Sequence, residues 1–375
     1  MELAEFRACL DRWLDEHTAE LAPPAEDPTL ADHMAHLSQV KRLTFDAGWM
    51  RYGWPESVGG LGGSPLLRAY LGEALTLRGL VEPGIYSMAE VLVPTMLDFA
   101  PPALAAEMVP RLLRGDETWC QGFSEPGTGS NLGSLACRAV RDGDSWRVTG
   151  QKVWTSLAQF AHRCVLLTRT GTPESAHRGI TAMFVDMDSP GITVRPIRAM
   201  HGAEEFCEVF FDGVVVPADR TLGQEGQGWA VAMDLLPYER STALWHRAAF
   251  LQRRLGDLIA QAGDDSLDPD DMGEAVELLY AFRARSRATQ YRLDSGDKLG
   301  AETSVDKVLV AIAEQTVFDL ALDGMAVGIT GGDDPASETW RREYLYSRAA
   351  SIYGGTAEIQ RNIIARRLLD LGAEA

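Results

Sequence analysis

In the first third of the chain, from Leu3 to about Gly115, apolar residues recur three and four positions apart. Residues with that spacing fall on one face of an α-helix, so the pattern predicts a helical region. One such face reads Leu66, Tyr70, Leu71, Leu75 and Leu77.

Between Phe123 and Pro217 the pattern changes to short apolar runs that favour β-strands. Asp142-Gly143 stands between two of these runs and is typical of a hairpin turn. The runs cover residues 146–148, 164–168, 180–186, 192–194 and 207–216.

After Pro217 the helical spacing returns, first over residues 243–259 and later over 305–322. Because strands and helices do not alternate, the order predicts an α+β fold and argues against a Rossmann domain that binds a nicotinamide cofactor. The predicted division is an N-terminal helical domain over 1–117, a central β domain over 118–219 and a C-terminal helical bundle over 220–375.

Composition narrows the class of protein. The chain has 375 residues, of which 46% are hydrophobic, so it can bury a large core. Its net charge of −19 argues against partners held by bulk electrostatics, namely nucleic acid and anionic membranes.

The charged first twenty residues do not resemble a signal peptide, and no apolar run is long enough to span a membrane. The cysteines are scattered without a CxxC pair, which favours reduced thiols and a cytoplasmic location, and the histidines show no metal-ligand spacing.

Three segments carry the candidate chemistry. Residues 121–131 (QGFSEPGTGSN) crowd small and hydroxyl side chains into one turn, whose free amides can bind a ring edge or a phosphate. Residues 151–156 (QKVWTS) alone favour a half-buried strand. Residues 353–366 begin with YGGTAEIQR, in which Thr356 is a predicted helix N-cap before an apolar stripe. The stripe reads Ile359, Ile363, Ile364 and Leu368.

In order and spacing, SEPGTGS (124–130), GQKVWTS (150–156) and YGGTAEIQR (353–361) resemble the signatures of the acyl-CoA dehydrogenase family. WPESVGGLG (54–62) and DGVVVP (212–217) resemble further landmarks, so the resemblance covers nearly the whole chain. It implies a helical domain, a β-barrel-like domain and a C-terminal four-helix bundle, with FAD between the last two and reaching across a subunit interface. The implied reaction, known in fatty acid metabolism, oxidises an acyl-CoA to the trans-2-enoyl-CoA.

The resemblance also assigns roles to single residues. The side chains expected along the isoalloxazine ring are Phe123, Ser124, Trp154 and Ser156. The further cofactor-binding positions are Ser130, Thr356 and Glu358. The substrate-binding positions are Ser130, Arg240 and Arg366, the last of which matches a position associated with CoA.

The reaction needs a base, because an α C–H is a weak acid even beside a thioester, and it needs donors that polarise the carbonyl. Gly354 stands where most of the family keeps its catalytic glutamate, although its backbone N–H remains available to the carbonyl. In a minority that resembles the long-chain and isovaleryl types, the base comes from an earlier Glu-Arg pair. Residues 237–240 (PYER) match that pair, which makes Glu239 the candidate base. Pro237 is expected to end one helix, leaving Glu239 in the first turn of the next. By pattern alone, an ordinary first-turn glutamate that stabilises a helix is the favoured interpretation, and the glycine at 354 shifts the balance to the catalytic one.

Two family features used on FAD from a neighbouring subunit are missing. The Arg-x-x-Phe-Gly loop has no counterpart in residues 258–267, and Gly328 replaces the glutamine of a Gln-x-x-Gly-Gly turn. Both losses affect the diphosphate and adenosine end of FAD. Either the chain pairs with a different, complete subunit, or it forms a homo-oligomer that holds FAD through altered contacts.

The first functional hypothesis is an FAD-dependent acyl-CoA dehydrogenase that passes electrons to an electron-transfer flavoprotein. The second is a non-catalytic or half-site subunit of a heteromeric dehydrogenase. The third is a flavin monooxygenase or oxidase on the same scaffold. The acyl chain, and whether CoA or a carrier protein holds it, stay open.

Overall fold

The computed structural model of the protein describes residues 1–24, 28–262 and 266–372. Helices fill the N-terminal third, as predicted. Thr29 begins α3 with a capping box that includes Asp32, and Ser64 caps α4, whose first residue is Pro65. The helices are α1 (Leu3–Glu16), α2 (Thr18–Leu21), α3 (Leu30–Asp46), α4 (Pro65–Leu77), α5 (Pro83–Tyr86), α6 (Met88–Phe99) and α7 (Pro102–Arg114).

An eight-stranded sheet follows, with strand order β6-β7-β3-β2-β4-β5-β8, and β1 pairs in parallel with β4. The five predicted β runs and the hairpin are confirmed, since Asp142 pairs with Ser145 across Gly143, whose φ is +59°. The strands are β1 (Trp119–Gly122), β2 (Arg138–Asp142), β3 (Ser145–Ser156), β4 (Arg163–Arg169), β5 (Ile180–Asp186), β6 (Ile192–Ile197), β7 (Phe206–Pro217) and β8 (Thr221–Leu222).

Strand β3 is irregular near its end. Its pairing with β7 shifts register between Lys152 and Thr155, and Trp154 between them has a left-handed backbone with φ of 60°. Such a bulge turns a side chain away from the regular pleat. The indole of Trp154 is 58% exposed, which is unusual for so large an aromatic residue.

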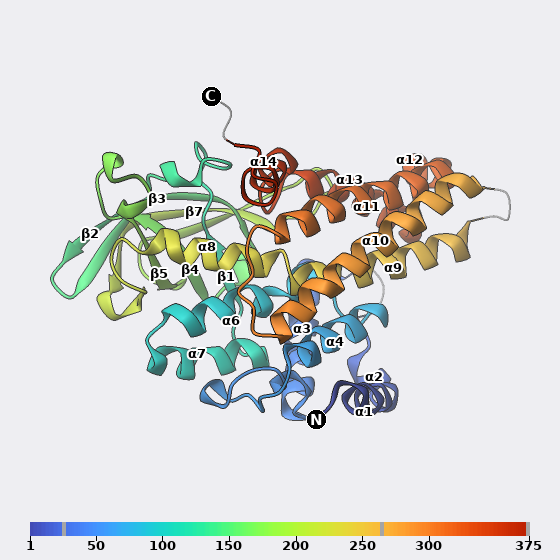
Figure 1. Ribbon diagram of the computed structural model, residues 1–375, viewed down its shortest axis with the longest axis horizontal. Helices are drawn as coiled ribbons and strands as arrows, with labels where there is room; N and C mark the ends of the chain where they lie inside the picture. Colours follow the sequence, from blue (N-terminus) through green and yellow to red (C-terminus); the bar gives the residue numbers. More distant parts are fainter. Residues whose placement is uncertain (25–27, 263–265, 373–375) are drawn as a thin grey trace.

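Helices return after the sheet and confirm the predicted α+β order. Helices α9, α10 and α11 share a core that includes Phe250, Phe282 and Phe318. In Figure 1 the sheet and this bundle lie at opposite sides of the molecule, with α8 along the sheet and the N-terminal helices below. The elements are α8 (Gly228–Glu239), α9 (Thr242–Gln261), α10 (Pro269–Asp294), α11 (Thr303–Gly324), α12 (Ala326–Gly331), α13 (Pro335–Ser347) and α14 (Ala357–Arg367).

The predicted break at Pro237 is wrong. Pro237 lies inside α8, which continues to Glu239, and the chain turns at Ser241 before α9 begins. A proline removes its own N–H from the helix and its ring crowds the carbonyl four residues earlier, yet a short terminal turn continues here and is closed by Arg240 N–H donating to the Pro237 carbonyl (3.1 Å). Glu239 therefore ends one helix instead of beginning the next.

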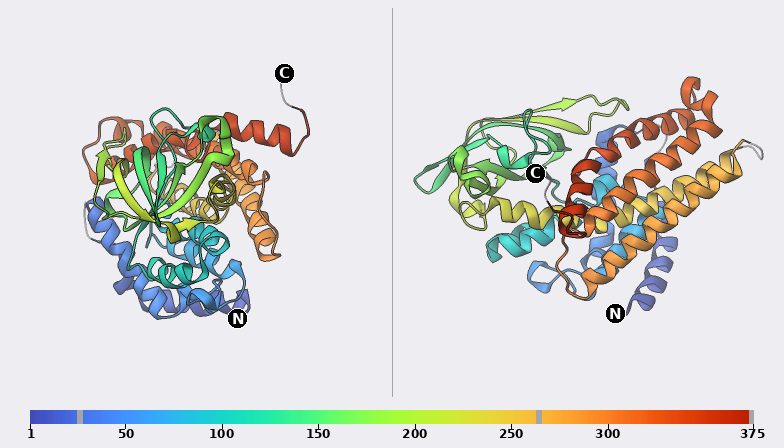
Figure 2. Two further views of the ribbon diagram at one scale, coloured as in Figure 1. Left: turned by 90° about the vertical axis from the view of Figure 1, so that its left-hand side faces the viewer. Right: turned by 45° about the horizontal axis from the view of Figure 1, so that its top comes forward.

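The predicted domain limits fall near changes in secondary structure. The limit at 117/118 lies between α7 and β1, whereas the limit at 219/220 lies just before β8, which pairs with β5. This three-part division stays a prediction. Helix α14 lies where the sheet and the C-terminal bundle meet, and Figure 2 shows this from two further sides. The site is built around that junction.

Candidate active site

The loop before α14 is held by three buried side chains from different helices. Lys307 on α11 donates to the carbonyl of Ala350. Arg240, directly after α8, donates from Nε and Nη2 to the carbonyl of Gly354 at 3.2 and 3.0 Å. Gln360 on α14 donates to the same oxygen at 3.0 Å. Because these donors come from separate elements, they fix the loop relative to the whole C-terminal bundle.

The two glycines of this loop need their backbone freedom. Gly354 and Gly355 have φ of +63° and +88°, in the left-handed region. A Cβ on Gly355 would lie only 2.4 Å from Nε2 of Gln360. While the carbonyls of the loop are bound, the N–H groups of both glycines have no acceptor within the described part of the chain. The loop thus offers donors to a bound molecule.

The structure brings Glu239 and Gly354 together, as the base hypothesis requires. Oε1 of Glu239 lies 3.0 Å from the position that a Cβ on Gly354 would occupy, and Cε of Lys307 lies 3.1 Å from it. A side chain at position 354 would therefore begin in space that these two residues already fill. Glu239 is half-buried, and its carboxylate has no hydrogen-bond partner among the described residues.

Charged groups surround this carboxylate. Burial lowers the pKa of Arg240, while the charge of Glu239 opposes that shift. Burial lowers the pKa of Lys307 to about 8, against the pull of Glu314 and Glu239. Glu314 is fully buried and accepts two hydrogen bonds from Arg247 at 2.8 and 2.6 Å. Glu314 is thus paired with Arg247, whereas the Glu239 carboxylate has no hydrogen-bond partner among the described residues.

A second group of predicted residues lies on the sheet side. Phe123 is buried at 7% exposure, Ser124 and Ser156 are half-buried, and Ser130 and Trp154 are exposed. The backbone of Val153 donates to the carbonyl of Ser124 at 2.9 Å, which ties the 123–131 turn to β3. The residues predicted along the flavin ring therefore come from two adjoining segments.

An ion pair that the sequence reasoning did not single out anchors this turn. Lys152 is fully buried and donates to the carbonyl of Phe123 (3.0 Å) and to Oε1 of Glu125 (2.7 Å). The Glu125 carboxylate also accepts from the backbone N–H groups of Ala136 and Cys137 at 2.6 and 2.9 Å. A buried ion pair with its remaining hydrogen bonds made is rigid, so the turn is preformed.

The sheet-side residues suit a flat aromatic ring. Positions 127 and 129 are open, because a Cβ added to Gly127 or Gly129 would meet nothing within 4 Å. The exposed indole of Trp154 on its bulge offers a face for stacking, and strained backbone of this kind occurs at ligand sites. These features fit the ring end of FAD.

The region expected near the far end of FAD is different. Gly328 lies on α12, where Arg341 binds the carbonyls of Ile329 (2.8 Å) and Gly332 (2.6 Å). That arginine is therefore committed to the backbone of its own chain. Of the other region, 258–267, residues 263–265 lie outside the described residues. Gly328 has no side chain that could take the place of the missing glutamine.

On α14, Thr356 is the N-cap, as predicted, and accepts from the N–H of Ile359 at 3.3 Å. Hydrogen bonds from its own backbone and from Thr356 lower the pKa of the exposed Glu358. Arg366 is exposed in the last turn. The predicted apolar stripe is only partly buried, and Leu368, past the end of the helix, is 42% exposed. The buried residue of α14 is instead Gln360, because the loop carbonyls need its amide.

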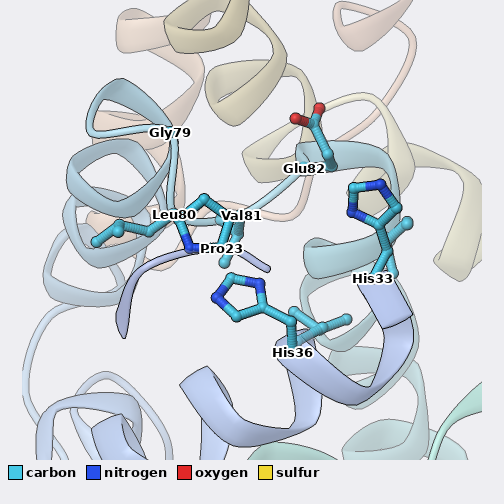
Figure 3. Close-up of a pocket in the computed structure, with 9 residues that line it drawn as sticks. Pro23, His33, His36, Gly79, Leu80, Val81 and Glu82 are labelled. Carbon is cyan, nitrogen blue, oxygen red and sulfur yellow. The ribbon is translucent and has the colours of Figure 1, made fainter. Parts of the chain in front are cut away.

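Two cavities lie apart from these residues. One of about 340 Å³ lies beside α8, and its lining includes Phe99, Tyr238 and Lys298. A smaller one of about 50 Å³, shown in Figure 3, is lined by N-terminal residues that include His33 and His36. Burial lowers the pKa of His33. Neither cavity contains a predicted site residue.

Within the described ranges, no cluster of three or more His, Cys, Asp or Glu side chains is placed to hold a metal ion. In the same residues, none of the helices combines the length and apolar character that crossing a membrane requires.

Comparison with known proteins shows to which family the chain belongs. Residues 120–214 match the acyl-CoA dehydrogenase middle domain, and residues 226–369 match the acyl-CoA dehydrogenase C-terminal domain. Acyl-CoA dehydrogenase IpdE1 of Mycobacterium tuberculosis is 36% identical over 389 residues, covering 100% of this chain and 99% of that protein. The chain belongs to the acyl-CoA dehydrogenase family. It is an oxidoreductase of that flavoprotein family, as the motifs predicted.

Solved structures share the fold. The structure entitled Tcur3481-Tcur3483 steroid ACAD superposes with a TM-score of 0.82 at 25% identity, covering 99% of this chain and 97% of that one. A chain of the ChsE4-ChsE5 complex from Mycobacterium tuberculosis superposes with a TM-score of 0.78 at 24% identity, with 100% of both chains covered. Each of these two structures is named for a pair of proteins.

Proposed function

We propose that this acyl-CoA dehydrogenase carries out FAD-dependent α,β-dehydrogenation of an acyl thioester, with Glu239 as the base. The observation that carries the proposal is the 3.0 Å approach of the Glu239 carboxylate to the side-chain position of Gly354. Glu239, at the end of α8, places its carboxylate beside position 354, where most of the family has a catalytic glutamate on the loop. A glycine at 354 leaves the room that this arrangement needs.

Each remaining residue then has a defined task. Glu239 takes the α proton of the acyl group, and the N–H of Gly354 polarises the thioester carbonyl as negative charge develops on its oxygen. FAD held beside Phe123, Ser124, Trp154 and Ser156 would supply the acceptor for the β hydrogen and its electron pair. Arg240 acts through the loop by holding the Gly354 carbonyl, so its guanidinium reaches the substrate only indirectly. Arg366 is exposed and is proposed to bind a phosphate of CoA.

The test is spectral. Flavin-loaded wild-type protein should bleach anaerobically when an acyl-CoA substrate is added, and Glu239→Gln should bleach about 10³-fold more slowly with its flavin content unchanged. Glu274→Gln is the matched control, because this glutamate is exposed on α10. Bleaching of Glu239→Gln at the wild-type rate would refute the assignment of the base.

We further propose that the chain works in a hetero-oligomer, in which a second dehydrogenase subunit completes the binding of the FAD diphosphate. Support comes from Gly328 in place of a glutamine, from the engagement of Arg341 with its own backbone, and from the paired names of the structural relatives. A homo-oligomer with altered contacts is the alternative. Flavin per chain, measured on the lone protein and on the co-purified pair, separates the two.

The finer assignments rest on the same reaction. The electrons are proposed to pass to an electron-transfer flavoprotein in the cytoplasm, and the acyl group to be carried by CoA. A substrate panel should include straight-chain and steroid-type acyl-CoA thioesters, since one relative is entitled a steroid ACAD, and one carrier-protein thioester. Hydrogen peroxide or a hydroxylated product formed under air would favour the oxidase or monooxygenase alternative instead.

A further inference from the structure

Gln360 is the residue of α14 that is buried against the glycine loop. Its Nε2 donates to the carbonyls of Gly354 (3.0 Å) and Gly355 (3.3 Å), and the side chain is fully buried. An amide nitrogen carries two hydrogens, so both are used on these two oxygens. Turning the amide over would place Oε1 against the two carbonyl oxygens, which fixes the orientation of the side chain. The glycine carbonyls therefore take up the whole donor capacity of Gln360.

These hydrogen bonds hold the peptide groups on both sides of the Gly355 α-carbon. Arg240 adds two hydrogen bonds to the Gly354 carbonyl, whereas Gln360 reaches both carbonyls. A pair of glycines turns over readily, because no Cβ restricts its backbone rotation. A peptide group bound at its oxygen, next to another that is also bound, cannot turn over without breaking these bonds. Gln360 therefore keeps the peptide between Gly354 and Gly355 in one orientation.

The orientation of this peptide decides where the N–H of Gly355 points. In a trans peptide the N–H is directed opposite to the C=O. Since Arg240 and Gln360 bind the Gly354 oxygen on one side, the Gly355 N–H faces the other side. Gly354 has a left-handed backbone, with φ of +63°, and neighbouring N–H groups of a helical backbone of either hand point in about the same direction. The two glycines thus present a pair of N–H donors, for which the described residues provide no acceptor.

We propose, on the basis of the function proposed above, that the N–H groups of Gly354 and Gly355 together bind the thioester oxygen, and that Gln360 is the positioning residue that aims the second of them. When the α C–H bond breaks, its proton goes to Glu239 and its electron pair moves toward the thioester oxygen. Donors that already point at that oxygen stabilise its charge without having to turn first. Gln360 itself acts only through the loop.

The experiment compares Gln360→Met, which removes the amide at similar length, with Gln315→Met as the matched control. Gln315 on α11 also donates from Nε2 to a backbone carbonyl, that of Ser347 at 3.3 Å, in the segment ahead of the glycine pair. All proteins are studied as flavin-loaded holoprotein, together with the partner subunit if the flavin requires it. The probe is an acyl-CoA analogue whose β carbon is replaced by sulfur, so that its α proton can be removed while dehydrogenation stops.

Two quantities are measured for the bound analogue. One is its dissociation constant at a pH where it is neutral, and the other is the apparent pKa of its α C–H, followed by the absorption of its enolate as pH rises. We expect Gln360→Met to raise that pKa by about one unit, a roughly tenfold loss of enolate stabilisation, with the dissociation constant within about threefold of wild type. Gln315→Met should match wild type in both quantities. An unchanged pKa in Gln360→Met, or an equal rise in the control, would overturn the proposal and leave Gln360 a structural role.

A measurement on the wild type decides the proposal if Gln360→Met does not fold. The stretching frequency of a carbon-13-labelled thioester carbonyl in the bound analogue reports the hydrogen bonds to its oxygen. Two donors that are fixed in place should lower this frequency below its value in water. A frequency equal to that in water, or above it, would overturn the proposal.

Glu239→Gln, measured alongside, separates this proposal from the proposed function. If Glu239→Gln reduces its flavin with an acyl-CoA as fast as wild type, the base assignment fails, while the effect of Gln360→Met on the bound analogue still decides the role of the loop. If Glu239→Gln is inactive while Gln360→Met leaves the pKa of the analogue unchanged, only the positioning role fails.

Discussion

The loop at Gly354 and the region at Gly328 differ in how much of their task this chain supplies. At Gly354, buried donors from α11, from the α8–α9 junction and from α14 fix the backbone, and a carboxylate stands beside it. Near Gly328, by contrast, Arg341 donates its hydrogen bonds to backbone carbonyls of its own chain.

The difference separates two requirements of the reaction. Proton removal needs groups within a few ångströms of one carbon, and a single chain can hold them on rigid elements. FAD is a long molecule, so the residues that would hold its diphosphate are not those that would remove the proton. On this account the chain is self-sufficient for the proton and depends on a second subunit for the far end of the cofactor.

The largest expected effect tests whether the base can return to the loop. In the double variant Glu239→Gly with Gly354→Glu, activity should stay about 10³-fold below wild type. A Cβ at position 354 would still lie 3.1 Å from Cε of Lys307, on backbone with φ of +63°, so the loop must shift. Rates of anaerobic flavin reduction decide this, and recovery to within tenfold of wild type would show that Lys307 and the loop tolerate either arrangement.

The next effect concerns the Gly328 end. The lone chain, purified by itself, should carry at least about tenfold less flavin per chain than the pair with its partner subunit, because a ligand held at one end only loses much of its binding energy. Flavin absorbance divided by protein concentration measures it. Full flavin occupancy of the lone chain would erase the contrast between the two regions.

A smaller effect is expected at the loop anchor. Arg240→Met should lower the free energy of unfolding by about 3 kcal/mol, because it removes two hydrogen bonds from a charged donor to the part-buried Gly354 carbonyl. Arg287→Met is the control, since Arg287 is exposed on α10, and its change should be below about 0.5 kcal/mol. Denaturant titration of both holoproteins measures the difference. Equal stabilities would mean that Gln360 and Lys307 suffice to hold the loop.

The smallest effect is a pH dependence of stability. The folded pKa of Lys307, about 8, lies below its unfolded value of 10.5, so the folded state holds fewer protons between these pH values. Stability must then rise with pH across this window. Between pH 7.5 and 9.5, wild type should gain roughly 2 kcal/mol relative to Lys307→Met. An unchanged difference would place Lys307 in a more solvated setting.

Much of the fold followed from local patterns. The alternation in 207–216 became β7, the spacing in 305–322 became α11, and Thr356 became an N-cap, because each depends on neighbours in the sequence. The predicted helix end at Pro237 was wrong, since whether a helix continues past a proline depends on the packing around it. The meeting of Glu239 and Gly354 was predicted from family resemblance, because no local pattern joins positions so far apart.

Lys307 and Gln360 were missed for a physical reason. A lysine and a glutamine on helices ordinarily point to water, and only the tertiary neighbours show that both are buried against loop carbonyls. One signal was present: Asp306 and Lys307 interrupt the otherwise apolar run from Val305 to Ala313, which is typical of charges buried with partners.

The central claim is that Glu239 removes the α proton. It is tested most directly by α-hydrogen exchange in deuterated water, followed by NMR, on an acyl-CoA analogue whose β carbon is replaced by sulfur so that dehydrogenation stops. The flavin-loaded wild-type protein should exchange the α hydrogens for deuterium, and Glu239→Gln with equal flavin content should exchange them at least about 10²-fold more slowly. Equal exchange rates in the two proteins would contradict the account.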